Sequence, residues 1–90
     1  MSDIQKLKVR IIGAFDEPYL CDADMVVMPG RDGELGAMPF HVPMIVELKG
    51  GSVRIYNGSD ITPIHISGGI ARIDALTIDI LHSGESQDAS

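Results

Sequence analysis

The stretch that says most about the fold is Val53-Arg54-Ile55-Tyr56-Asn57-Gly58-Ser59-Asp60. Its first four residues read as a short strand that runs directly into an Asn-Gly pair. Asn-Gly tolerates the positive φ angles of a tight turn between antiparallel strands, so the sequence predicts a β-hairpin that returns along residues 61–67. Because Pro63 in the returning segment has no N–H to donate, we expect that strand to begin at Pro63 or to lie at a sheet edge.

A period of two dominates the rest of the chain. Between residues 7 and 11, apolar side chains alternate with charged ones, as in a strand with one buried face. Residues 25–28 form a continuous apolar run that ends at Pro29-Gly30, which predicts a strand buried on both sides. Residues 44–48 form another short strand, and residues 70–81 alternate again, with Ile70 in the apolar set and Ala75 in a turn. Short strands at this spacing predict an all-β sandwich or barrel.

Length and charge limit the functional classes. Ninety residues make one domain, which we expect over residues 1–82, followed by a polar and disordered tail at 83–90. The formal net charge of −6, with only seven Lys and Arg residues, argues against a nucleic-acid partner. No apolar run approaches the ~20 residues of a membrane-spanning helix, and the N-terminus lacks the features of a secretory signal. The single cysteine, Cys21, permits no internal disulfide and suits a reducing compartment.

Catalytic motifs are not apparent in the sequence. The histidines at 41, 65 and 82 match no compact metal-ligand spacing, although a small metal-dependent barrel enzyme remains an alternative. Carboxylates near Cys21 raise a thiol pKa rather than lower it. Ser67 precedes Gly68-Gly69 without the pattern of a hydrolase elbow, and we expect the glycine pair to allow a sharp corner or the close approach of another backbone. The sequence predicts no catalytic site and no cofactor.

The segment Pro29–Pro43 is different in composition from an ordinary surface loop. It contains three prolines and three glycines in fifteen residues, which predicts a stiff and shaped loop. Such a loop presents Leu35, Met38, Phe40 and Val42 either to a protein partner or back onto the core. One hypothesis is therefore that the chain is a free-standing β-sandwich adaptor that binds another protein through this loop.

Several blocks of sequence occur in an order that resembles the epsilon subunit of F-type ATP synthase. They span residues 7–81 and include Gly33-Glu34-Leu35-Gly36, Pro39-Phe40-His41-Val42-Pro43 and Ser67-Gly68-Gly69-Ile70. The resemblance implies a small β-sandwich of about eight to ten mostly antiparallel strands. It also implies a non-catalytic subunit of the central stalk, which links the gamma subunit and the c-ring so that ion-driven rotation is coupled to ATP synthesis.

The resemblance also implies positions for the contacts. The residues expected to meet the c-ring are Glu34, Leu35 and Gly36, and those expected at the gamma subunit or the stalk foot are His41, Val46, Ser67, Gly68 and Gly69. The protein is then peripheral to the cytoplasmic face of a bacterial inner membrane, without direct insertion.

The chain departs from the family pattern at two places. The family usually has glycine where this chain has Phe40, so the loop backbone differs there or the phenylalanine adds an apolar contact. No helical hairpin pattern follows Leu81. Because that hairpin inhibits ATP hydrolysis and in some members binds ATP, we expect coupling without self-inhibition and without nucleotide binding.

Overall fold

The computed structural model describes residues 5–13 and 16–82, which form nine strands and no helix. The strands are β1 (Leu7–Ile12), β2 (Tyr19–Ala23), β3 (Met25–Gly30), β4 (Gly33–Ala37), β5 (Met44–Leu48), β6 (Gly51–Asn57), β7 (Asp60–Ile66), β8 (Gly69–Ile73) and β9 (Thr77–His82). The expected all-β sandwich of eight to ten mostly antiparallel strands is confirmed. The predicted tail at 83–90 lies outside the described residues.

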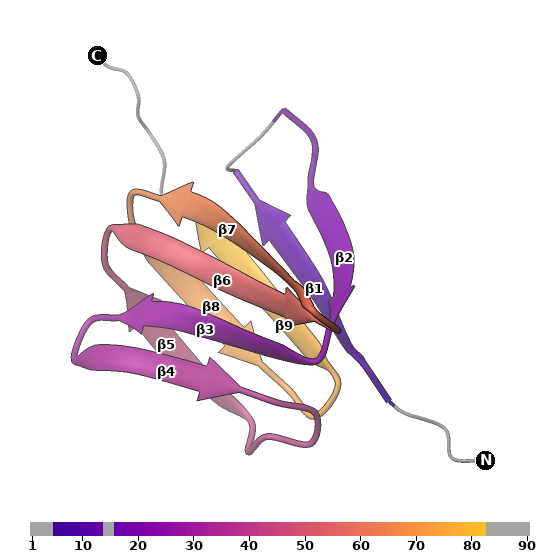
Figure 1. The fold of residues 1–90 in the computed structure, drawn as a ribbon. Coiled ribbons are helices and arrows are strands. Elements are labelled where there is room, and N and C mark those ends of the chain that lie inside the picture. Colours follow the sequence, from indigo (N-terminus) through magenta and orange to yellow (C-terminus); the bar gives the residue numbers. More distant parts are fainter. Residues whose placement is uncertain (1–4, 14–15, 83–90) are drawn as a thin grey trace.

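One curled sheet makes both layers of the sandwich (Figure 1). The strand order is β2-β1-β9-β8-β5-β3-β6-β7, with β4 paired to β3. The layer β2-β1-β9-β8-β5 faces the layer formed by β3, β4, β6 and β7, and the sheet passes between them where Gly30 of β3 pairs with Leu48 of β5. Among the paired strands, only β1 and β9 run parallel.

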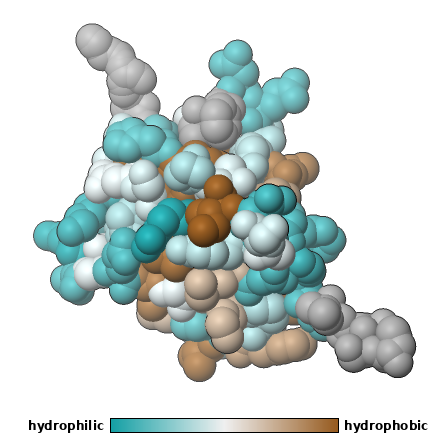
Figure 2. All heavy atoms as spheres, in the orientation of Figure 1, coloured by the Kyte–Doolittle hydropathy of each residue, from teal (hydrophilic) through white to brown (hydrophobic). Residues whose placement is uncertain are grey.

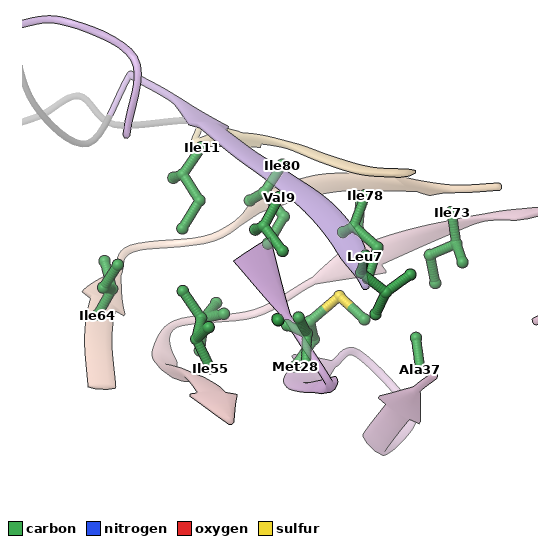
Figure 3. Close-up of a cluster of buried hydrophobic side chains, with 14 of the residues drawn as sticks. Leu7, Val9, Ile11, Met28, Ala37, Ile55, Ile64, Ile73, Ile78 and Ile80 are labelled. Carbon is green, nitrogen blue, oxygen red and sulfur yellow. The ribbon is translucent and has the colours of Figure 1, made fainter. Parts of the chain in front are cut away.

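The core lies between the two layers and is made of aliphatic side chains. Alternation along the strands places these side chains inward, so that Val9, Ile78 and Ile80 point across the gap toward Met28 and Ile55 (Figure 3). No polar or charged side chain is buried among the residues that the structure describes. The interior is therefore stabilised by apolar burial and packing rather than by buried hydrogen bonds.

The hairpin predicted at the Asn-Gly pair is confirmed. Strands β6 and β7 pair along their length: Gly51 pairs with Ile66 at the open end, and Asn57 pairs with Asp60 at the turn. Strand β7 is the last strand of the sheet order. Pro63 lies within this edge strand, as its missing N–H requires.

Three expectations about the strands were wrong. Much of the segment Pro29–Pro43 is not loop, because Gly33–Ala37 pairs with β3 and forms β4. Strand β3 is not buried on both faces, since Met25 and Val27 alternate with the core residues and are half-buried. Ile70 is exposed on β8, because Ala71 and Ile73 take the two core positions.

Asp24 connects three segments at one end of the sandwich. Its carboxylate accepts a hydrogen bond from the Gly58 backbone N–H at 2.7 Å and forms an ion pair with Lys6 Nζ at 2.8 Å. Its own N–H donates to the Tyr56 carbonyl. The Gly58 hydrogen bond, followed by Lys6, lowers the pKa of Asp24 below its usual range. The ionised side chain therefore holds the β6–β7 turn against the start of β3.

Replacing Asp24 by asparagine is expected to flatten the loss of stability in acid. Because the folded-state pKa lies below the unfolded one, the contribution of Asp24 is complete above about pH 4 and is lost as the pH falls through the folded value. Melting temperatures measured from pH 6 to pH 2 should fall more steeply for the unmodified protein than for Asp24→Asn. Asp60→Asn removes one carboxylate from the β6–β7 hairpin that Asp24 contacts, and it is the control. Parallel curves of melting temperature against pH for all three proteins contradict a stabilising role of the ionised Asp24.

Candidate functional site

The sandwich is open along one side, between β4 and β5. In the described part of the chain, β4 pairs with β3 alone. Strand β5 joins β3 at the register pair of Gly30 with Leu48, and β4 and β5 do not pair with each other, which leaves a gap between them. A groove of about 430 Å³ occupies this side, and we call it the β4–β5 groove. Leu35 and Val46 line it and pack against the core, which gives the groove an apolar floor. Its lining residues are Gly30, Arg31, Asp32, Gly33, Glu34, Leu35, Met44, Ile45, Val46 and Glu47.

Charged side chains surround one end of the β4–β5 groove. Arg31 Nη1 lies 2.9 Å from Glu47 Oε1, and Arg54 Nη2 lies 3.0 Å from both oxygens of Glu34. These pairs are largely exposed, and exposed pairs contribute only ~0–1 kcal/mol each. The groove therefore combines an apolar floor with charged groups that can exchange their present ion pairs for pairs with a partner protein at a small free-energy cost.

A second groove lies on the other side of Ile45 and Glu47, and we call it the β5–β8 groove. It has a volume of about 580 Å³, and Ser67, Gly68 and Gly69 form one wall. A side chain at Gly69 is impossible without movement, because its Cβ would lie 2.0 Å from the Leu81 carbonyl oxygen. The expected close approach of a second backbone at this glycine pair is thus confirmed.

His82 holds the Ser67 corner in place. Its Nε2 accepts a hydrogen bond from the Ser67 backbone N–H at 2.7 Å, so Nδ1 carries the proton and donates to the Gly13 carbonyl at 3.2 Å. The last strand is therefore connected to the corner before β8 and to the end of β1. This arrangement assigns His82 a structural task rather than metal binding.

The structure groups the expected contact residues differently from the sequence. Glu34 and Leu35 share the β4–β5 groove with Val46, although the first two were assigned to the c-ring and Val46 to the gamma subunit or stalk foot. Ser67, Gly68 and Gly69 line the neighbouring β5–β8 groove. The structure therefore joins the two expected contact regions into one surface along β5.

Gly36 and His41 lie outside both grooves. A Cβ at Gly36 would contact Met25 and Val27, so this glycine faces the other side of β4. His41 is in the turn between β4 and β5, where its Nδ1 lies 2.8 Å from the Val42 carbonyl oxygen.

The ridge between the two grooves is formed by Ile45 and Glu47, which no sequence pattern marks as a site. Ile45 is 72% exposed, and together with Glu47 it lines both of them. Alternation within residues 44–48 marks Ile45 and Glu47 as one face of a strand, but it does not say which face is outward. An exposed isoleucine beside an ion pair is a feature that only the folded chain displays.

A third hollow, over β1, has no free charge to offer a ligand. It has a volume of about 540 Å³, and its two basic side chains are already paired. Lys8 Nζ lies 3.0 Å from Asp22, and the Arg10 guanidinium lies 3.2 Å from both oxygens of Asp79. These pairs fill the cross-strand positions of an ordinary solvated sheet face.

Cys21 and the metal-ligating residue types are candidates for reactive chemistry in the described part of the chain. Burial raises the pKa of the Cys21 thiol, Asp22 raises it further, and a hydrogen bond with Tyr19 lowers it. Burial, rather than the neighbouring carboxylates, is the largest cause. The thiol is therefore kept protonated and is a poor nucleophile. In the described part of the chain, no group of three or more His, Cys, Asp or Glu side chains is placed to hold a metal ion.

Comparison with known proteins identifies the family. The family model described as "ATP synthase, Delta/Epsilon chain, beta-sandwich domain" matches residues 6–84. The chain belongs to this family. The expected resemblance to epsilon subunits is thereby confirmed, and the nine-strand sandwich is the domain that gives the family its description.

Relatives and solved structures of the Delta/Epsilon family agree with this assignment. The ATP synthase epsilon chain of Acidithiobacillus ferridurans is 37% identical over 75 residues, which are 83% of this chain and 53% of the relative. A chain of the Euglena gracilis mitochondrial ATP synthase OSCP/F1/c-ring structure matches with a TM-score of 0.80 at 20% identity, over 93% of this chain and 54% of that one. A chain of the Tetrahymena thermophila mitochondrial ATP synthase central stalk/c-ring structure matches with a TM-score of 0.68 at 18% identity, over 92% and 67%.

The domain spans about half the length of the Acidithiobacillus relative. The part of the chain that the structure describes contains no helical segment that could span a bilayer.

Proposed function

We propose that this protein is a non-catalytic subunit of the ATP synthase central stalk, which binds the gamma subunit and the c-ring and helps to couple ion-driven rotation to ATP synthesis. The observation that carries the proposal is the continuous surface of two grooves along β5, in a family of ATP synthase chains. The names of the relatives support it, since they are epsilon chains, and so do the titles of the similar structures, which describe F1, central-stalk and c-ring assemblies.

A sandwich of this kind suits a mechanical task. Its layers enclose a packed aliphatic core, and packed interiors resist deformation and transmit strain. Its outer surface offers apolar and charged contacts at the same ridge, which is typical of protein interfaces with a polar rim. In this proposal the gamma subunit lies along β5, and the c-ring meets the adjacent end of the β4–β5 groove at Glu34. The protein is then peripheral to the cytoplasmic face of a bacterial inner membrane.

Co-expression with the gamma subunit of the same organism tests the proposal. We expect the two chains to elute together from size-exclusion chromatography at one-to-one stoichiometry. Ile45→Glu places a carboxylate on the ridge between the grooves and is expected to weaken the complex by about tenfold or more, because a charge at a desolvated interface centre is costly.

Ile61→Glu is the matched control for that experiment. Ile61 is also an exposed isoleucine on a strand, at 55% exposure, but it lies on β7 and lines neither groove. Equal weakening by both variants contradicts the location of the interface on β5. Separate elution of a folded, unmodified chain contradicts the rotor function. It favours the alternative hypothesis of a free-standing adaptor that binds another protein through the segment Pro29–Pro43.

A further inference from the structure

The turn between β4 and β5 contains a residue in an unfavourable backbone conformation. The His41 N–H donates to the Met38 carbonyl at 3.1 Å, which closes a four-residue turn with Pro39 and Phe40 at its centre. Phe40 has a φ of 69°, and it is the only non-glycine residue with positive φ in the described part of the chain. Proline followed by a positive φ is the pattern of a type II turn, whose third position favours glycine.

The fold does not use the Phe40 side chain to offset this cost. Phe40 is 66% exposed, so most of its ring lies in solvent. Its backbone contributes to the fold, because the Phe40 N–H donates to the Ala75 carbonyl in the turn between β8 and β9. A glycine can make the same hydrogen bond without strain. Most of the ring surface is therefore available to a partner.

The chain segment around Phe40 is apolar, and we call its exposed side chains the Phe40 rim. Met38, Val42 and Met44 are exposed beside it. No Asp, Glu, Lys or Arg occurs from Leu35 through Val46, in a chain with a net charge of −6. In Figure 2, hydrophobic atoms gather along the lower edge of the view, where Figure 1 places the connection from β4 to β5. Exposed apolar patches of this kind mark contact sites.

We propose that Phe40 is an anchor residue that inserts into an apolar pocket of the gamma subunit, which lies along β5 in the proposed function. This inference rests on the proposed function, because it assigns the Phe40 rim and the groove to one partner. Continuity carries the assignment, since Met44 belongs to the rim and also lines the groove.

The composition of the rim agrees with a protein partner. The nearby Arg72 lies 3.5 Å from Asp74 and is paired, so the rim lacks the free basic groups that favour a membrane surface.

The local geometry is suited to an anchor. Two prolines, at 39 and 43, and the hydrogen bond to Ala75 fix the turn before any partner arrives. A fixed turn presents the ring without a further ordering cost on binding, and aromatic residues in central pockets dominate many interfaces. The strain at Phe40 lowers the stability of the free chain, whereas the ring strengthens the complex.

This opposition gives a test with two readouts on the same variants. The dissociation constant for the gamma subunit is measured by titration calorimetry, and the melting temperature of the free chain is measured by circular dichroism. For Phe40→Gly we expect binding at least about tenfold weaker, with a melting temperature that is unchanged or raised by up to ~5 °C. For Phe40→Leu, which keeps an apolar side chain and the strain, we expect intermediate binding and no gain in melting temperature.

Leu20→Ala is the matched control, because Leu20 is 67% exposed and lies on β2, away from the rim and both grooves. Binding by Phe40→Gly that equals the unmodified protein overturns the anchor while leaving the rotor proposal intact. Absence of gamma binding by the unmodified chain overturns both. A Phe40-dependent dimer of the chain alone, or Phe40-dependent flotation with phosphatidylcholine vesicles, together with unchanged gamma binding, assigns the rim to another occupant and also overturns the proposal.

Discussion

Replacing Gly69 by alanine is expected to prevent folding or to lower the melting temperature by at least ~15 °C, as about 3 kcal/mol or more does in a domain of this size. Gly69 has a φ of +147°, which L side chains rarely adopt, and its new Cβ would lie 2.0 Å from the Leu81 carbonyl oxygen. Relief requires β8 and β9 to separate at the pair formed by Gly69 and His82. Thermal unfolding followed by far-ultraviolet circular dichroism measures the effect.

Gly33→Ala separates backbone strain from steric conflict. Gly33 has a similar φ of +139°, but a Cβ there would meet nothing within 4 Å. Strain alone costs on the order of 1–3 kcal/mol, so this variant should remain folded. If the two variants melt at similar temperatures, the close approach at Leu81 is not what makes Gly69 necessary.

Truncating Ile80 to alanine is expected to destabilise the protein by about 2–5 kcal/mol, because it removes buried methyl and methylene groups and leaves a cavity. Ile80 is fully buried on β9, with Ile11 and Ala71 as its register partners on the neighbouring strands (Figure 3). A domain of this length has a free energy of unfolding of roughly 5–15 kcal/mol, so the loss is a large share of the total. Urea unfolding with a constant m value gives the measurement.

Ile70→Ala removes the same atoms from a surface position and is the comparison for Ile80→Ala. Ile70 is 48% exposed on β8 and does not belong to the core. Its truncation should change the free energy of unfolding by less than about 1 kcal/mol. Similar losses at both positions contradict the placement of the core between the layers.

Local pattern was sufficient for most of the fold. The Asn-Gly pair located the β6–β7 hairpin, Pro63 marked an edge strand, and alternation identified the buried face of β1. Errors arose where burial depends on distant partners. Val27 belongs to an apolar run, yet it is only half-buried, because the outer face of β3 carries no further layer. Glycine and proline in residues 29–43 concealed β4, whose pairing with β3 overrides its weak strand propensity.

Less of the candidate surface than of the fold could be predicted from the sequence. The resemblance supplied Glu34, Val46 and the Ser67–Gly69 corner, but their arrangement in adjacent grooves depends on strands that are distant in sequence. Ile45 was not identified, because exposure on a strand is decided by the packing of the opposite face. Phe40 was noticed as an apolar residue of the segment Pro29–Pro43 and as a departure from a glycine position. Its positive φ is visible only in the folded backbone.

The parallel pairing of β1 with β9 also affects how the domain folds during its synthesis. Lys8 pairs with Thr77 and Ile12 pairs with Leu81. One edge of β1 therefore stays unpaired until β9 has been synthesised. During synthesis, β1 has left the ribosome long before β9 is made. Long-range pairings of this kind fold slowly, since the closure of a long loop precedes any gain from contacts. The nascent chain therefore passes through a period with an open strand edge, in which the lysine and arginine side chains of β1 disfavour pairing with other chains.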